Sequence, residues 1–223
     1  MNGTAGIAPA RQTRGLAFAR LPPHGPGMRI GLFGGTFDPA HEGHVRASLL
    51  ALRRLGLDSV WWLVTPGNPL KETAALPPLA ERLADARAKA RDPRIRVTAL
   101  EAHLGTRYTI DLLRALRQTC PGVAFVWIMG SDNLVQLDRW RRWQDIARLA
   151  TIAVVDRPGT TLKATASRGG HWLAPYRLSE GRARRGAAST PPALVILHGP
   201  RSPLSSTALR QSRQFRRVTP SNG

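Results

Sequence analysis

The feature that most constrains the fold is a regular alternation of short apolar runs with longer segments of helical periodicity, beginning at Met28. The apolar runs are nearly uninterrupted, as in strands that are buried on both faces of a parallel sheet. The segments between them carry apolar residues at helical spacing. Because strands and helices alternate along the chain, we predict an α/β fold: a Rossmann-like parallel sheet with helices on both faces.

The same pattern sets the expected boundaries. The predicted strands are the segments 28–35, 59–66, 94–100, 124–132, 151–159 and 193–200. The predicted helices are the segments 44–56, 78–92, 109–122, 134–150 and 205–215. Turn and cap residues, mainly glycine and proline, separate these segments.

The remaining segments lack this periodicity. Residues 1–27 are rich in Ala, Gly, Pro and Arg and contain no acidic residue, so we interpret them as a flexible basic arm. A nucleotide-binding type of domain is expected over 28–215, in which 159–192 is basic and aperiodic and is interpreted as a long loop or insertion. Residues 216–223 are expected to be a disordered tail.

Charge and cysteine usage narrow the class of protein. The formal net charge is +19, which fits a nucleic-acid partner, an anionic small substrate or the composition of a GC-rich genome. The basic residues are spread along the chain, so we expect no specific nucleic-acid partner. Cys120 is the only cysteine, which excludes a disulfide framework and indicates a reducing, cytoplasmic location. No run of eighteen apolar residues exists, so neither a membrane span nor a membrane partner is expected.

The stretch GLFGGTFDPAHEGH, residues 31–44, holds two adjacent glycines and two of the six histidines. It matches neither the dinucleotide pattern G-x-G-x-x-G nor the P-loop pattern G-x-x-x-x-G-K-[ST]. His41 and His44 are three residues apart, one fewer than in the zinc motif H-E-x-x-H, and no third candidate ligand lies nearby. We therefore predict no metal site in the protein itself.

This stretch does have the properties of a phosphate site. Glycines at the end of a strand let backbone come close to a ligand. The helix that follows begins with free N–H groups and the positive end of its dipole, both of which favour phosphate. His41 and His44 lie one turn apart, so their rings face the same side and can donate hydrogen bonds to phosphate oxygens.

The residues 34–44, read as G-G-T-F-D-P-x-H-x-G-H, resemble the signature of the nucleotidyltransferase superfamily with the (T/H)-x-G-H motif. The form found here resembles that of bacterial nicotinate-nucleotide adenylyltransferases. The resemblance implies a Rossmann-like fold and catalytic roles for His41 and His44. It also implies that ATP is bound by Gly34, Gly35, Thr36, Phe37 and Gly43.

Two further segments resemble phosphate-binding parts of this family. Residues 202–210, SPLSSTALR, resemble the signature S-S-T-x-x-R, which implies ATP contacts from Ser205, Ser206 and Thr207 and a catalytic role for Arg210. Lys71 ends the segment TPGNPLK, where the family places a lysine that reaches the reacting phosphates. Leu70 stands where relatives often carry histidine, which is a departure from the family pattern.

Three more segments resemble the parts of the family that hold the two nucleosides: RYTIDLLRAL, WIMGSDNLVQLDRWRRW and DRPG. Gly130 and Asp132, in WIMGSDNL, would face the adenosine of ATP. Four residues would bind nicotinate mononucleotide: Tyr108, Thr109, Trp140 and Arg157. Trp140 would stack on the pyridine ring, and Thr109 would also cap its helix.

The implied reaction joins ATP and nicotinate mononucleotide into nicotinate adenine dinucleotide and pyrophosphate, a step of NAD biosynthesis. A Mg²⁺ ion held mainly by substrate phosphates is expected as the cofactor. Three alternatives stay open at this point. They are adenylyl or cytidylyl transfer to another phosphate such as phosphopantetheine or glycerol phosphate, a nucleotide-binding regulatory relative without turnover, and a basic, non-catalytic nucleic-acid-binding protein.

Overall fold

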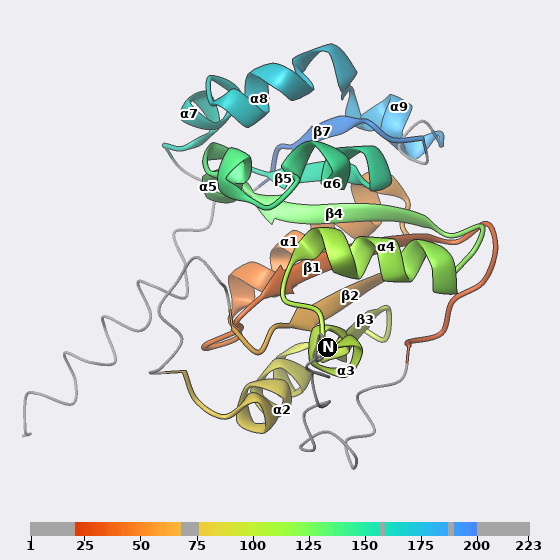
Figure 1. Ribbon diagram of the computed structural model, residues 1–223, viewed down its shortest axis with the longest axis vertical. Coiled ribbons are helices and arrows are strands. Elements are labelled where there is room, and N and C mark those ends of the chain that lie inside the picture. The colour runs from red at the N-terminus through yellow and green to blue at the C-terminus, as the bar shows by residue number, and fades with distance from the viewer. Residues whose placement is uncertain (1–20, 68–75, 157–158, 187–189, 200–223) are drawn as a thin grey trace, which may run out of the picture.

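The computed structural model describes residues 21–67, 76–156, 159–186 and 190–199, and its described part is built on one parallel sheet (Figure 1). Seven strands lie in the order β3-β2-β1-β4-β5-β7-β6, and every neighbouring pair is parallel. The strands are β1 (Arg29–Gly35), β2 (Ser59–Val64), β3 (Ile95–Thr98), β4 (Ala124–Gly130), β5 (Thr151–Val155), β6 (Arg177–Leu178) and β7 (Leu194–Leu197). The predicted fold class is confirmed.

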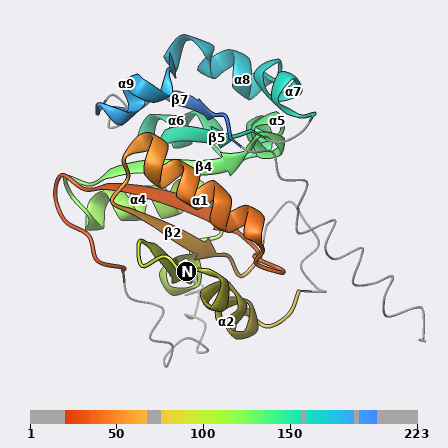
Figure 2. The same cartoon turned by 180° about the vertical axis from the view of Figure 1, so that it is seen from behind.

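Helices cover both faces of the sheet. Helix α4 lies in front of it in Figure 1, whereas α1 lies in front in the reverse view of Figure 2. The helices are α1 (Glu42–Leu55), α2 (Leu79–Lys89), α3 (Leu100–Leu104), α4 (Thr109–Thr119), α5 (Ser131–Val135), α6 (Trp143–Leu149), α7 (Thr161–Thr165), α8 (Arg168–Leu173) and α9 (Glu180–Arg184). Short 3₁₀ helices occupy Leu137–Arg139 and Ala174–Tyr176.

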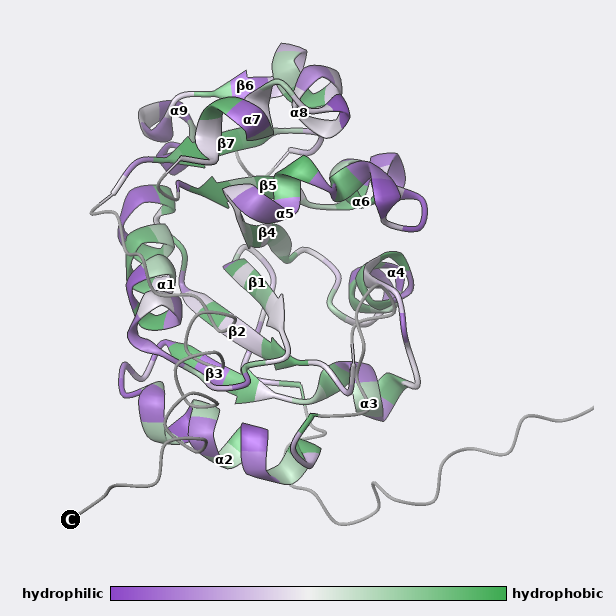
Figure 3. Cartoon of the chain, turned by 90° about the vertical axis from the view of Figure 1, so that its left-hand side faces the viewer, coloured by the Kyte–Doolittle hydropathy of each residue, from purple (hydrophilic) through white to green (hydrophobic). Residues whose placement is uncertain are grey.

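The sheet divides the apolar core into two layers. Figure 3 shows the sheet between helices on its two sides, with hydrophobic residues in green. Along a strand, successive side chains point to opposite faces. Trp61 accordingly packs with α4 in one layer, and Trp62, its neighbour in β2, packs with α1 in the other. Both indoles are fully buried, which explains why residues 60–64 of the strand are all apolar and do not alternate with polar residues.

The strand order reverses direction at β1, which lies between β2 and β4. In an open α/β sheet, ligands bind in the crevice at the carboxyl ends of the strands at such a crossover point. Phe33 in β1 pairs with Ile128 in β4, so the two strands end side by side at Gly35 and Gly130. The segments that follow these two glycines are therefore brought together by the topology alone.

Residues 159–192 were interpreted from the sequence as a long loop or insertion, and the loop alternative is wrong. The described residues of this segment contain α7, α8, α9 and the edge strand β6. These helices are five or six residues long, too short to show a periodic pattern in the sequence. Side chains still cap two of them, because Ser167 accepts from the Gly170 N–H and Ser179 accepts from the Arg182 N–H.

The predicted range of the basic arm, residues 1–27, was also too long. Residues 21–27 lie against the domain: Leu21 packs on the core, and the Gly27 N–H donates to the Gly122 carbonyl at 2.9 Å. Residues 1–20 lie outside the described ranges, as do the predicted helix 205–215 and the tail 216–223. In the part of the chain that is described, no helix combines the length and the apolar character needed to cross a membrane.

The single helix predicted over 134–150 is interrupted. Helix α5 ends at Val135, Trp140 has extended backbone angles, and Arg142 is left-handed at φ 51°, before α6 begins at Trp143. A left-handed arginine costs backbone energy that a continuous helix would avoid. The interruption turns the chain at Trp140, a residue predicted to bind substrate.

Candidate active site

The site is built around the turn that joins β1 to α1. Phe37 in this turn has a left-handed backbone at φ 48°, and His41 has an extended backbone and forms the N-cap of α1. The 36–41 turn, as we call residues 36–41, thus brings the chain from the end of a central strand directly into a helix start. The positive end of the helix dipole points towards the carboxyl edge of the sheet.

Backbone N–H groups hold the rings of the two histidines in place. The His41 N–H donates to the His44 Nδ1 at 3.2 Å, and the Gly43 N–H donates to the His41 Nδ1 at 3.1 Å. The ring centroids are 3.9 Å apart. Because each Nδ1 accepts a hydrogen bond, we infer that each neutral ring carries its proton on Nε2. Both imidazoles are therefore fixed as Nε2–H donors, which is the state that suits a phosphate oxygen.

Two aromatic side chains, Phe37 and Trp62, support the His44 ring. The Phe37 ring lies 4.7 Å from the His44 ring and stacks on Trp62 at 4.9 Å. The Trp62 Nε1–H donates to the Ser48 Oγ at 2.7 Å, and the Ser48 hydroxyl donates to the His44 carbonyl at 2.9 Å. With Phe37 only 1% exposed, its side chain belongs to the core. What Phe37 can offer to ATP is its backbone.

The Trp127 side chain lies between β1 and the proposed pyridine site. A Cβ atom on Gly34 would lie 3.0 Å from the Trp127 Cη2 atom, so the tip of this indole occupies the space that a side chain at Gly34 would need. On its other side, Trp127 meets Trp140 edge to face, with centroids 6.1 Å apart. Trp127 therefore connects the glycine pair to the tryptophan predicted to stack on the substrate.

We expect Gly34→Ala to lower the free energy of unfolding by about 1 kcal/mol, because the Trp127 ring must shift by a few tenths of an ångström to admit the new methyl group. Trp127→Phe removes the ring atoms that collide. In the double variant, the cost of the alanine should largely disappear. Urea denaturation of the four proteins measures this coupling, and strictly additive effects would contradict the contact.

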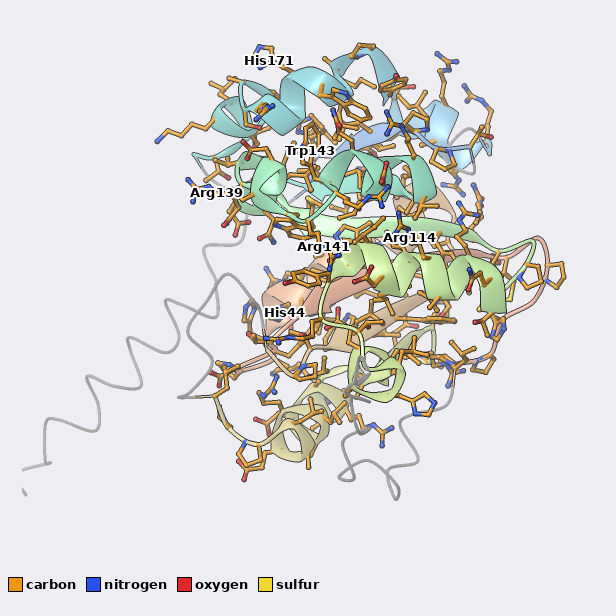
Figure 4. All side chains as sticks on the ribbon, viewed as in Figure 1. His44, Arg114, Arg139, Arg141, Trp143 and His171 are labelled. Atoms are coloured by element: carbon orange, nitrogen blue, oxygen red, sulfur yellow. The ribbon has the colours of Figure 1, made fainter. Side chains whose placement is uncertain are left out.

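The two segments predicted to hold nicotinate mononucleotide lie next to each other. The Arg141 guanidinium lies over the Tyr108 ring at 4.8 Å and 3.8 Å from an Asp111 carboxylate oxygen. Figure 4 shows Arg141 near the start of α4, with His44 lower on the same view. Tyr108, rather than Thr109, is the N-cap of α4, so the predicted capping role of Thr109 is wrong. Thr109 is instead the first residue of the helix.

Gly130 and Asp132, predicted to face adenosine, follow β4 directly. Gly130 is the N-cap of α5, and Asp132 lies in its first turn. Because β4 ends beside β1, these residues lie at the same edge of the sheet as the 36–41 turn. The Gln136 side chain donates to the Asp132 carbonyl at 3.4 Å, which joins the two ends of this short helix.

A buried acid lies behind the segment that follows β2. Glu101 in α3 is 8% exposed and hydrogen-bonds the Thr65 side chain. Thr65 also bonds the backbone of Gly67, which fixes the start of the segment. Burial raises the pKa of the Glu101 carboxyl above its ordinary value, and the Thr65 hydrogen bond offsets part of this shift.

This raised pKa predicts a pH dependence of stability. A carboxyl whose pKa is higher in the folded state binds its proton more tightly when folded, so the protein loses stability as pH rises from the unfolded pKa, near 4.5, through the folded one. Glu101→Gln, which carries no charge, should therefore be more stable than the wild type at pH 8, and the difference should shrink towards pH 4. Thermal melts across this range would contradict the prediction if the difference were constant.

Several predicted site residues lie outside the described residues. This applies to Lys71, to Arg157 and to the whole second phosphate segment, which comprises Ser205, Ser206, Thr207 and Arg210. Their roles, like those of the other predicted site residues, remain predictions. Within the described ranges, no group of three or more His, Cys, Asp or Glu side chains is placed so that it could hold a metal ion.

Sequence reasoning missed four residues that shape this site. Trp127 was included in a motif without a role, and Ser48 sits in a helix as an ordinary small polar residue. Glu101 and Arg82 carried the clearer signal. Arg82 lies three and four residues from Leu79 and Ala86 on the apolar face of α2, and a charge at such a core position indicates a specific buried contact.

Comparisons with known proteins agree with this geometry. Residues 32–212 match the model of the cytidylyltransferase-like family. A protein of Methylorubrum extorquens named "Probable nicotinate-nucleotide adenylyltransferase" is 56% identical over 183 residues, covering 82% of this chain and 99% of that protein. A relative of the same name from Brucella abortus is 52% identical over 184 residues, covering 82% of this chain and 95% of that protein.

The fold is also found among solved structures. The Plasmodium falciparum nicotinic acid mononucleotide adenylyltransferase complexed with NaAD aligns with a TM-score of 0.61 and 17% identity, covering 82% of this chain and 83% of that one. At this identity the likeness concerns the fold alone. The family match and the close relatives carry the assignment: this chain belongs to the cytidylyltransferase-like family and, within it, to the nicotinate-nucleotide adenylyltransferases.

Proposed function

We propose that the protein transfers the adenylyl group of ATP to nicotinate mononucleotide, which yields nicotinate adenine dinucleotide and pyrophosphate in NAD biosynthesis. The observation that carries this proposal is the pair of imidazoles at the start of α1. Their Nδ1 atoms are used by backbone N–H groups, and their rings lie 3.9 Å apart at the crossover point of the sheet. Such a pair is arranged to donate to the oxygens of a phosphate.

The chemistry needs positioning more than acid–base catalysis. The 5′-phosphate of the mononucleotide attacks the α-phosphorus of ATP, one P–O bond forms, and the bond to the bridging oxygen breaks as pyrophosphate leaves. The nucleophile is already an anion, so it needs no strong general base. The protein must hold two anions together and stabilise the charge that develops on the leaving group.

In our proposal, different residues hold the α-phosphate and the leaving pyrophosphate. His44 donates to the α-phosphate, with His41 and Lys71 beside it. The second phosphate segment, with Ser206, Thr207 and Arg210, holds the leaving pyrophosphate. The backbone of the glycine pair and of the 36–41 turn lines the remaining phosphate oxygens.

We take Mg²⁺ to enter as part of the substrate, MgATP. An Nε2 atom that carries a proton cannot be a metal ligand, so the two histidines do not fit a magnesium site. Magnesium is commonly held by substrate phosphates and water with few protein ligands. We place the reaction in the cytoplasm because the chain's only cysteine, Cys120, gives no basis for disulfides.

The choice of acceptor follows from the relatives and from charge. The relatives' names favour nicotinate mononucleotide over phosphopantetheine or glycerol phosphate. The nicotinate ring carries a carboxylate, whereas nicotinamide carries a neutral amide. Arg141 lies over Tyr108 and is adjacent in sequence to Trp140, the proposed pyridine stack, so its positive charge supports an acceptor whose ring carries a carboxylate.

A panel of acceptors tests the proposal. The full chain is incubated with MgATP and, in turn, nicotinate mononucleotide, nicotinamide mononucleotide, phosphopantetheine and glycerol phosphate. Pyrophosphate release and the dinucleotide product are both measured. We expect turnover with nicotinate mononucleotide well above the other three. Turnover with another acceptor, or ATP binding without pyrophosphate release, would contradict the proposal, as would tight, steeply salt-dependent nucleic-acid binding without turnover.

A further inference from the structure

Among the described residues, the Arg82 side chain is a buried cation whose hydrogen bonds go to backbone carbonyls. Arg82 in α2 is 3% exposed. Its Nη1 donates at 2.8 Å to the carbonyl of Thr36 and at 2.8 Å to that of Thr65, its Nη2 donates to Pro66 at 3.3 Å, and its Nε donates to Pro77 at 3.0 Å. All three guanidinium nitrogens are thereby used.

A buried charge is expensive unless its donors are satisfied. Burial lowers the pKa of the Arg82 guanidinium, and the nearby Asp38 carboxylate counteracts this shift. An apolar side chain would fill the same position on the apolar face of α2 without this cost. What it would not do is hold four carbonyl oxygens in fixed relative positions, because only the planar guanidinium fork has donors in several directions.

Three of the four carbonyls that Arg82 holds belong to two segments with proposed substrate roles. Thr36 begins the 36–41 turn, which leads to His41 and His44. Thr65 and Pro66 follow β2 and begin the segment that continues to Lys71, which itself lies outside the described residues. The Thr65 N–H also donates to the Gly35 carbonyl at 3.0 Å. The Arg82 Nη1, which donates to both Thr36 and Thr65, therefore joins the ends of the adjacent strands β1 and β2.

We propose that Arg82 is a positioning residue for adenylyl transfer, which fixes the histidine-bearing turn against the segment that leads to Lys71. The proposal rests on the proposed function, since it assigns a role within the same site. Arg82 acts through backbone and does not touch substrate. Its effect should fall on the geometry of the reacting phosphates, where a displacement of about 1 Å can cost about a hundredfold in rate.

The test compares Arg82→Met and Arg82→Lys with the wild type and with Arg87→Met, an exposed arginine of the same helix as a matched control. For Arg82→Met we expect kcat to fall about a hundredfold while the KM for ATP changes less than about threefold. Arg82→Lys should be intermediate, because one ammonium group can reach only some of the carbonyls. Arg87→Met should behave as the wild type.

Two outcomes would overturn the proposal. One is an unchanged kcat per folded molecule with only a lower melting temperature, which is the result of a purely structural role. The other is a loss confined to KM. If Arg82→Met does not fold, Arg82→Lys decides alone, with a fall in kcat of at least about tenfold expected. If the wild type prefers another acceptor, the proposed function fails, but the ratio of variant to wild type measured with that acceptor still tests Arg82.

Discussion

His44→Asn should lower kcat by a factor of about a hundred to a thousand while the affinity for ATP changes less than about threefold. The oxygen of asparagine can take the place of Nδ1, so the hydrogen bond from the His41 N–H can survive. The Nε2–H donor is lost. Removal of one donor aimed at charge that develops in the transition state costs on the order of 10²–10³ in turnover. His44→Ala should lose at least as much.

Steady-state kinetics and ATP binding separate the possible outcomes. His44→Gln, whose amide nitrogen reaches towards the Nε2 position, should retain more turnover than the asparagine variant. His103→Ala, at an exposed histidine in α3, serves as the control and should leave both parameters unchanged. A raised KM with an intact kcat would contradict the role given to His44, because such a loss indicates uniform binding of ground and transition states.

Trp140→Ala should weaken nicotinate mononucleotide roughly tenfold to a hundredfold and leave ATP nearly unaffected. Stacking of a base on an aromatic side chain contributes about 1–3 kcal/mol. Trp140 is half-buried and packs against Trp127 in the core layer of α4, on the other face of the sheet from α1. Its removal should therefore affect one substrate much more than the other.

Calorimetric titration with each substrate measures this difference. Trp140→Phe keeps a smaller stacking face and should recover most of the affinity for the mononucleotide. An equal loss of affinity for both substrates would remove the assignment of Trp140 as the pyridine stack. It would indicate instead that the Trp127–Trp140 contact supports the whole crevice.

The strands and the main helices were predictable because their patterns are local. After Ser59, the run VWWLV is apolar at every position, which identifies a strand that is buried on both faces. Helix α1 combines a histidine N-cap with the left-handed Gly56 at its end. The interruption at Trp140 was not predictable in this way. The sequence around it is compatible with a continuous helix, and the extended backbone goes with a tertiary contact between Trp140 and Trp127 that no local pattern records.

In the candidate site too, the parts set by a local motif were predictable and the contacts between distant segments were not. The 36–41 turn and its histidines were identified from a motif with a physical rationale. Arg82 and Glu101 act on that turn and on Thr65 from helices that are distant in sequence, and no local pattern records which carbonyl or hydroxyl a buried charge will meet. The short helices α7, α8 and α9 escaped prediction for a simpler reason: each spans fewer than two turns.

A crystal structure of the protein with nicotinate mononucleotide and a non-hydrolysable ATP analogue tests the central claim most directly. That claim is that two helix beginnings, at residues 41–44 and 205–207, meet on one triphosphate. We expect the His44 Nε2 within hydrogen-bonding distance of the α-phosphate and residues 205–207 on the β- and γ-phosphates. Phosphates bound away from His44, or the two segments opening onto separate clefts, would contradict it.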